Sequence, residues 1–196
     1  MPLGPMVLEN RYVRLRPFEP DADGAELRAL AERAPEIFRL WYHRGPGDWV
    51  GKWVETIRTR TADGSMIPFA VTRAADGAFL GCTSWLDPSE AHMSVEIGMT
   101  CYAPEAQGTA VNPSCKLLLM QHCFEVWGAR RVQYQVDERN KRSQAGVLKL
   151  GAKQEGILRN HRTNHDGYVR NTVFFSIIDS EWPEVKARLE ARLAAA

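Results

Sequence analysis

The sequence has no run of apolar residues near the roughly 18 that a membrane-spanning helix needs. Its first residues, Met1-Pro2-Leu3-Gly4-Pro5, lack the basic and apolar regions of a signal peptide. Its four cysteines show no C-x-x-C spacing, which argues against a disulfide framework and against a zinc site. We therefore expect no membrane partner, four buried and reduced thiols, and a cytoplasmic location.

An excess of charge of one sign is also missing. The 25 basic and 24 acidic residues leave a formal net charge of +1, which argues against a general nucleic-acid binder. His161 and His165 have no obvious further ligands near them in the sequence, so we expect no metal site. The charge is uneven only over residues 128–162, where nine basic residues and three acidic ones give +6. Either a solvated surface or a phosphate-binding patch explains this stretch.

The composition that is present is that of one globular domain, residues 1–196, with 44% hydrophobic and 25% charged residues. Alternating segments predict strands, apolar residues at helical spacing predict helices, and Asp76-Gly77 and Asp166-Gly167 predict hairpins. The predicted strands are residues 11–17, 67–73, 78–86, 92–102, 131–136, 153–161 and 168–178. The predicted helices are residues 25–34, 48–60, 116–127 and 144–150, and one that begins near Ser180. This order predicts an α+β fold with a mixed sheet covered on both faces.

The most informative segment is Gln107-Gly108-Thr109-Ala110-Val111-Asn112-Pro113, which lies between a predicted strand and a predicted helix. The first N–H groups of a helix have no partner within it, and the helix dipole adds positive potential there. Small residues at this point let phosphate oxygens reach the backbone, so the loop indicates a pyrophosphate site. We expect Asn112 to cap the helix and Pro113 to fit its first turn. An ordinary strand-to-helix turn is the alternative interpretation.

A second pattern follows the next predicted strand. Asn140-x-x-Ser143 precedes a short predicted helix that ends in Leu150-Gly151-Ala152. Together with the loop, this pattern resembles the GNAT superfamily of acyl-CoA N-acyltransferases. The segment 11–18 and the late Glu155-Gly156 resemble more closely the branch that contains the ribosomal-protein N-terminal acetyltransferases, which modify alanine or serine termini. The resemblance runs from about residue 8 to residue 193.

The resemblance implies the GNAT fold, whose central sheet is mixed and mostly antiparallel with helices on both faces. It also implies acetyl-CoA as cosubstrate. The pyrophosphate would meet the loop, the acyl arm would meet the strand before it and the segment that begins at Asn140, and the basic stretch would meet the 3′-phosphate. The residues expected to bind CoA are Ile97, Gly98, Met99, Gln107, Gly108, Thr109, Ala110, Val111, Asn112, Asn140, Ser143 and Lys149.

The loop departs from the superfamily pattern, which is Gln/Arg-x-x-Gly-x-Gly/Ala. Ala110 and Asn112 occupy the two positions where small residues are expected. Alanine fits at the first of them only if its φ is negative, because glycine alone visits positive φ freely. Asn112 either crowds the diphosphate or donates a hydrogen bond to it.

Acetyl transfer needs a base for the amine and a proton for the leaving thiolate. By resemblance, Ser143 is the candidate donor to the thiolate, and the cap of the short helix is its alternative role. Glu96 is the candidate base and could equally be an ordinary strand carboxylate. A glycine inside a strand often marks a close backbone approach, which supports Gly98 at the acyl site. Trp41 and Trp85 are candidates for contact with the acceptor, and core packing is their alternative.

The sequence thus predicts an acetyl-CoA-dependent N-acetyltransferase that acts on a protein or peptide N-terminal α-amine by direct attack in a ternary complex. One alternative keeps the enzyme and changes the acceptor to a small amine, an antibiotic or a lysine. Another is a catalytically silent acyl-CoA sensor, for which the two changed loop positions argue. The superfamily often forms dimers, so a homodimer is also expected.

Overall fold

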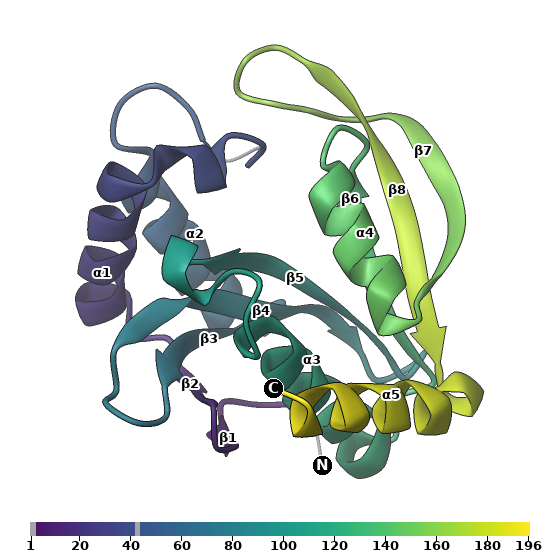
Figure 1. The fold of residues 1–196 in the computed structure, drawn as a ribbon. Helices are drawn as coiled ribbons and strands as arrows, with labels where there is room; N and C mark the ends of the chain where they lie inside the picture. Colours follow the sequence, from purple (N-terminus) through teal and green to yellow (C-terminus); the bar gives the residue numbers. More distant parts are fainter. Residues whose placement is uncertain (1–2, 42–43) are drawn as a thin grey trace.

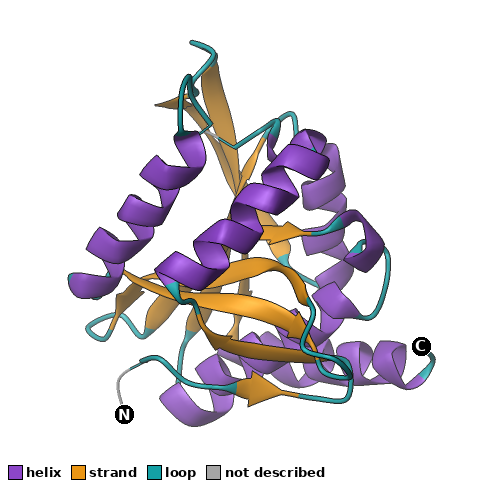
Figure 2. Ribbon diagram, turned by 90° about the vertical axis from the view of Figure 1, so that its left-hand side faces the viewer, coloured by secondary structure: helices purple, strands orange, loops and turns teal. Residues whose placement is uncertain are grey.

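The computed structural model describes residues 3–41 and 44–196, which form an eight-stranded sheet with helices on both sides (Figures 1 and 2). The strands are β1 (Leu8–Glu9), β2 (Val13–Pro17), β3 (Met66–Arg73), β4 (Phe79–Ser89), β5 (Ser94–Tyr102), β6 (Arg131–Asp137), β7 (Lys153–Thr163) and β8 (Val169–Ile178). The helices are α1 (Pro20–Arg33), α2 (Trp49–Ala62), α3 (Val111–Gln121), α4 (Lys141–Leu150) and α5 (Trp182–Ala194). A π-helical segment, His122–Trp127, continues α3.

The strands follow the order β1-β2-β3-β4-β5-β6-β8-β7 across the sheet. All neighbours are antiparallel except β5 and β6, which are parallel. The expected mixed and mostly antiparallel sheet is therefore confirmed. The parallel pairing covers only Ser94–Glu96 against Arg131–Gln133, although both strands continue beyond it. Within the described chain, β5 and β6 thus part from each other after three residue pairs.

Two apolar cores lie on opposite faces of the sheet. One joins the sheet to α3 and α5, and the other joins it to α1 and α2. Strand β3 supplies both, because successive side chains of a strand point to opposite faces. Phe69 and Val71 belong to the first core, whereas Ala70 belongs to the second. This two-sided burial explains why β3 is apolar almost without interruption.

Turn and cap chemistry accounts for several element boundaries. The Asp48 side chain accepts the Gly51 N–H and begins α2. Gly77 has a φ of +76° between β3 and β4, as the Asp76-Gly77 hairpin signal predicts. The Asn140 side chain accepts the Ser143 N–H, so Asn140 is the cap of α4. Ser143 lies inside the helix, and its alternative role as the cap is wrong.

Two other expectations also need correction. Asn112 does not cap α3, because the helix begins one residue earlier at Val111 and the Thr109 hydroxyl accepts the Val111 N–H. The predicted strand 11–17 forms β2, but the two-residue β1, which is absent from the predicted strands, pairs with its outer side. A segment of two residues carries too little periodicity to be recognised in a sequence.

Candidate active site

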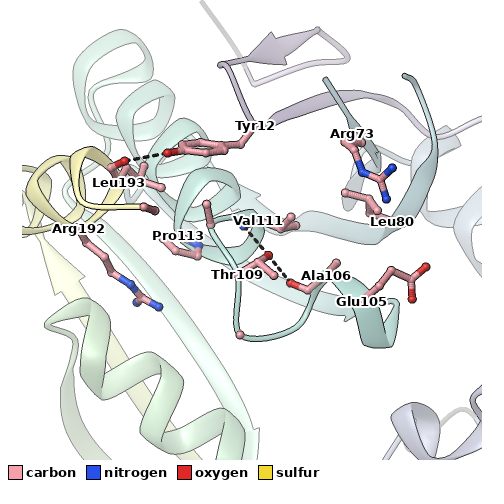
Figure 3. Close-up of a pocket in the computed structure, with 13 residues that line it drawn as sticks. Tyr12, Arg73, Leu80, Glu105, Ala106, Thr109, Val111, Pro113, Arg192 and Leu193 are labelled. Atoms are coloured by element: carbon pink, nitrogen blue, oxygen red, sulfur yellow. Dashed lines mark hydrogen bonds between the residues drawn. The ribbon is translucent and has the colours of Figure 1, made fainter. Parts of the chain in front are cut away.

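The loop before α3 presents backbone donors at a helix N-terminus. Among the described residues, the N–H groups of Gly108, Thr109, Ala110 and Asn112 have no hydrogen-bond acceptor. Gly108 has a φ of +78°, which glycine adopts without strain. The Thr109 hydroxyl donates to the Ala106 carbonyl and holds the turn (Figure 3). The free donors and the helix dipole together make this loop suitable for an anion.

A pocket of about 510 Å³ adjoins the loop (Figure 3). The loop residues Gly108, Thr109 and Ala110 line one part of it. Arg192 on α5 lines another part of the pocket. Arg73 at the end of β3 and Glu105 also line it, and they are ion-paired with Asp76 and Arg33, respectively. The pocket therefore combines backbone donors with positive charge, as a phosphate-bearing ligand requires.

The two residues that depart from the superfamily loop pattern, Ala110 and Asn112, lie at the start of α3. Ala110 has a φ of −67°, so alanine fits at this position without the positive φ that would require glycine. Asn112 is half-buried in the first turn of α3. The Gln107 side chain donates to the Tyr102 carbonyl over 2.8 Å, so its amide holds the loop against the end of β5.

Strand β5, which precedes the loop, has a bulge beyond the residues at which it pairs with β6. The register between β4 and β5 shifts between Cys82 and Ser84, opposite the segment that contains Met99. Met99 has a φ of +49°, an uncommon conformation for a residue other than glycine. A Cβ on Gly98 would lie 2.7 Å from Leu86 Cδ1 and 2.8 Å from Glu96 Oε1. A larger residue there would have to displace the ends of these two side chains, so glycine leaves room for the Glu96 carboxylate. Ile97 beside it is 2% exposed.

Glu96 occupies the last paired position of β5 against β6 and is 7% exposed. Its Oε2 accepts a hydrogen bond of 2.6 Å from Gln135 Nε2, and Gln135 Oε1 accepts one of 3.3 Å from Arg162. Burial raises the pKa of Glu96 to about 7, against the opposing effect of Arg162. The carboxylate can therefore exchange a proton near neutral pH, as a general base must.

Helix α4 supplies the next candidate residues. Ser143 is half-buried, and its hydroxyl forms no hydrogen bond within the described chain, so it is free to donate to a ligand. Lys141, Arg142 and Lys149 are exposed on the same helix. Other members of the basic stretch are paired with acids: Arg131 with Glu155, Arg139 with Asp137 and Lys153 with Glu181. The unpaired cations of the stretch thus include those on α4.

The two tryptophans proposed at the acceptor site have different surroundings. Trp41 is half-buried and packs against Phe38 and Trp53, at centroid distances of 5.0 and 5.5 Å. Trp85 is fully buried, with its ring 4.9 Å from Phe69 and 5.4 Å from His122. The structure therefore places Trp85 in the core on the α3 face, away from any surface that an acceptor could reach.

Sequence reasoning missed three polar residues of this region. Gln135 and Arg162 connect β6 and β7 to Glu96, and no local pattern signals a contact between distant strands. Lys116 is buried under β5, and its burial could have been predicted from the helical spacing of the sequence. It lies four residues before Met120, on the face of the helix that enters the core, where a lysine is unusual.

Three further observations concern the thiols, the membrane and metal binding. Cys82, Cys101, Cys115 and Cys123 are buried free thiols, as predicted. No described helix is both long and apolar enough to span a bilayer. Over residues 3–41 and 44–196, no three His, Cys, Asp or Glu side chains form a cluster that could hold a metal ion.

Comparison with known proteins identifies the family. Residues 13–153 match the family model of the acetyltransferase (GNAT) domain, whereas none of the curated proteins matches. A T. thermophilus protein assigned as an acetyltransferase is 36% identical over 98% of this chain and 100% of its own, with a TM-score of 0.83. A GCN5-related N-acetyltransferase from Brucella melitensis is 28% identical over 98% and 87%, with a TM-score of 0.88. Mycobacterium smegmatis RimJ, solved in complex with CoA-disulfide, shares the fold at 24% identity over 97% and 95%, with a TM-score of 0.80.

The site offers what acetyl transfer from a thioester to an amine requires. Backbone donors at α3 suit a pyrophosphate, the parted strands leave backbone groups of β5 free, and Glu96 can take a proton. The family match covers residues 13–153, most of the chain. The chain therefore belongs to the GNAT family and is an acetyl-CoA-dependent N-acetyltransferase.

Proposed function

We propose that the acceptor is the α-amine at the N-terminus of a peptide or protein, and that Glu96 takes its proton. The observation that carries this proposal is the Glu96 carboxylate, buried where β5 and β6 part and with a pKa of about 7. A base is most effective when its pKa lies near the working pH. A base of this strength suits an amine that is partly neutral already.

A terminal α-amine meets that condition better than a lysine does. With reference pKa values near 7.7 and 10.4, about one-sixth of α-amines but only about 4 in 10,000 lysines are neutral at pH 7. Only the neutral amine can attack the thioester. The weak base Glu96 is therefore sufficient for an N-terminus.

The charges around Glu96 argue against a polycationic acceptor. The charged groups that act on its pKa are, in decreasing order, Arg162, Asp87, Arg60 and Arg170, and Arg60 is ion-paired with Asp87. Positive charge near the base repels polyamines and aminoglycosides. A peptide instead offers one amine and a backbone that can pair with an exposed strand edge.

CoA is held by the residues that the resemblance indicates. The loop residues Gln107, Gly108, Thr109, Ala110, Val111 and Asn112 surround its pyrophosphate, and Ile97, Gly98, Met99 and Asn140 adjoin its acyl arm. The exposed Lys149 on α4 faces the 3′-phosphate. Ser143 donates to the departing sulfur, and Trp41 contacts the acceptor. The free hydroxyl of Ser143 and the partial exposure of Trp41 support these two assignments.

The enzyme works in the cytoplasm as a homodimer. Its four buried free thiols suit a reducing compartment. Strand β7 is at the edge of the sheet, and Ile157 and Leu158 on it are 51% and 49% exposed. An unpaired edge with apolar side chains favours pairing with a second copy.

The acceptor is tested by measuring thiol release from acetyl-CoA with three matched substrates. These are a lysine-free peptide with a free N-terminus, an N-terminally blocked peptide with one internal lysine, and spermidine. We expect kcat/KM for the free N-terminus to be at least about 10-fold higher than for the others, because its neutral fraction is larger. Mass spectrometry should place the acetyl group on the α-amine.

Two outcomes would contradict different parts of this proposal. Faster reaction of the blocked peptide or of spermidine at equal concentration would reject the α-amine and leave the acetyltransferase intact. Absence of thiol release with every amine, despite CoA binding, would favour the acyl-CoA sensor.

A further inference from the structure

Lys116 on α3 is a buried cation at the opening of the sheet. Its side chain is 5% exposed, and its Nζ lies 3.2 Å from the Thr100 hydroxyl and 5.6 Å from the centroid of the Tyr134 ring. Thr100 belongs to β5 and Tyr134 to β6. Both lie beyond Glu96 and Gln133, the last residues at which these strands pair. The ammonium therefore contacts side chains of both strands on the α3 face, beyond the point at which the strands part.

This charge has no acid to balance it. Within the described chain, no carboxylate oxygen lies within 4.0 Å of Lys116 Nζ. The titratable groups around it are the Cys115 thiol and the Tyr134 phenol, whose pKa values burial raises, so both stay neutral. Burial lowers the pKa of Lys116 to about 8, and the side chain is mostly protonated at pH 7. A buried unpaired ammonium is costly, and an arriving anion would relieve that cost.

One hydroxyl links this ammonium to the bulge of β5. The Thr100 oxygen lies 3.2 Å from Lys116 Nζ, 3.4 Å from the Gly98 carbonyl oxygen and 2.8 Å from the Thr83 hydroxyl. Gly98 adjoins the position proposed for the thioester. Lys116 approaches the opening from the α3 face, whereas Glu96 lies beside Leu86 of the core formed with α1 and α2. The cation and the base thus approach from opposite faces of the sheet.

We propose that the Lys116 ammonium binds the CoA thiolate that acetyl transfer releases. This inference rests on the placement of CoA under the proposed function. In the reaction the amine nitrogen forms a bond to the acetyl carbon and passes a proton to the Glu96 carboxylate. The carbon–sulfur bond breaks, and its electron pair stays on sulfur as a thiolate. Lys116 supplies the positive charge that this anion needs in a buried place.

The test compares CoA with desulfo-CoA, which lacks the thiol, by calorimetric titration at pH 6 and pH 8. An opposite charge lowers the pKa of a thiol, near 8.5 when free, by about 1 to 3 units. We therefore expect CoA to bind roughly 10-fold more tightly than desulfo-CoA at pH 8, and nearly equally at pH 6, where the thiol stays protonated. Ultraviolet absorption should show thiolate in the complex at pH 8.

Lys116→Met should abolish the preference for CoA at pH 8 while both ligands still bind. Lys52→Met is the matched control, because Lys52 is exposed on α2, and it should keep the preference. Without ligand, Lys116→Met should melt at the same temperature as the wild type or higher, since it removes a buried charge. If Lys116→Met melts at a lower temperature than the wild type, Lys116→Gln should be used to compare CoA with desulfo-CoA, because glutamine keeps a donor for Thr100.

Equal preference for CoA in the wild type and the Lys116 variants would overturn the inference and leave the CoA site intact. Failure of the wild type to bind either ligand would reject the CoA site itself, and with it the proposed function.

Discussion

Replacing Glu96 with glutamine should slow acetyl transfer about 10²- to 10⁴-fold, the usual range for loss of a general base. Glutamine keeps the size of the side chain and an oxygen for the Gln135 hydrogen bond, but it cannot take a proton. The affinity for CoA should change by less than about twofold, because the group acts on the amine. Thiol release at saturating substrates gives the rate, and calorimetry gives the affinity.

The Glu96→Gln substitution should also change how the rate and the stability depend on pH. Because the carboxylate must be ionised to act, the wild-type rate should rise with pH through about 7, and the variant should lose that limb. Folding should respond in the opposite direction. A carboxyl whose pKa rises from 4.5 to about 7 on folding destabilises the fold as pH increases across that window. At pH 8 the variant should therefore be more stable than the wild type, by up to about 3 kcal/mol.

The exposed Glu90→Gln serves as the control, because it makes the same change in the turn between β4 and β5. It should leave the rate and its pH profile unchanged. If Glu96→Gln retained the wild-type rate, or lost rate and stability together at pH 8, Glu96 would be a structural carboxylate.

The second large effect is expected from Ala110→Glu in the loop before α3. A carboxylate there would lie beside the free N–H groups proposed to receive the pyrophosphate. Two like charges about 4 Å apart repel by about 4 kcal/mol at an effective dielectric constant of 20, and each 1.4 kcal/mol is tenfold in affinity. CoA should therefore bind about 10²- to 10³-fold more weakly, as measured by calorimetric titration.

Ala110→Gln separates charge from size. Glutamine has nearly the volume of glutamate but no charge, so its loss of affinity should stay below about 10-fold. Ala110→Gly should bind CoA as well as the wild type, because φ at this position suits either residue. Equal losses in the glutamate and glutamine variants would point to crowding and would remove the electrostatic argument for this loop.

Local chemistry made much of the fold predictable. The Asp76-Gly77 turn needs a positive φ that glycine allows, and alternate residues of the strand before it enter opposite cores. Gly98 was recognised because a glycine within a strand often marks a close approach, and a Cβ there would meet the Leu86 and Glu96 side chains. The loop before α3 was recognised from its small residues next to a helix N-terminus. The sheet and its helical layers follow from such signals taken in sequence order.

The parts that escaped prediction depend on contacts between distant residues. The separation of β5 from β6 after three pairs has no sequence signature, because it is a property of how two strands meet. Met99 adopts a positive φ without being glycine, so no local pattern predicts its conformation, although the neighbouring Gly98 marked this segment. Trp85 looked available to an acceptor but fills the core, since a tryptophan in a strand fits either face. Lys116 was overlooked because its helix was judged by its apolar residues alone.

The most direct test of the account is the unfolding temperature of the wild-type chain with and without CoA. A ligand that binds only the folded state at 100 times its dissociation constant stabilises it by about 2.7 kcal/mol. For 196 residues that corresponds to a rise in Tm of about 5 to 10 °C. Adenosine, which has no phosphates, should raise Tm far less at the same concentration. An unchanged Tm at saturating CoA would contradict the pyrophosphate site on which the account depends.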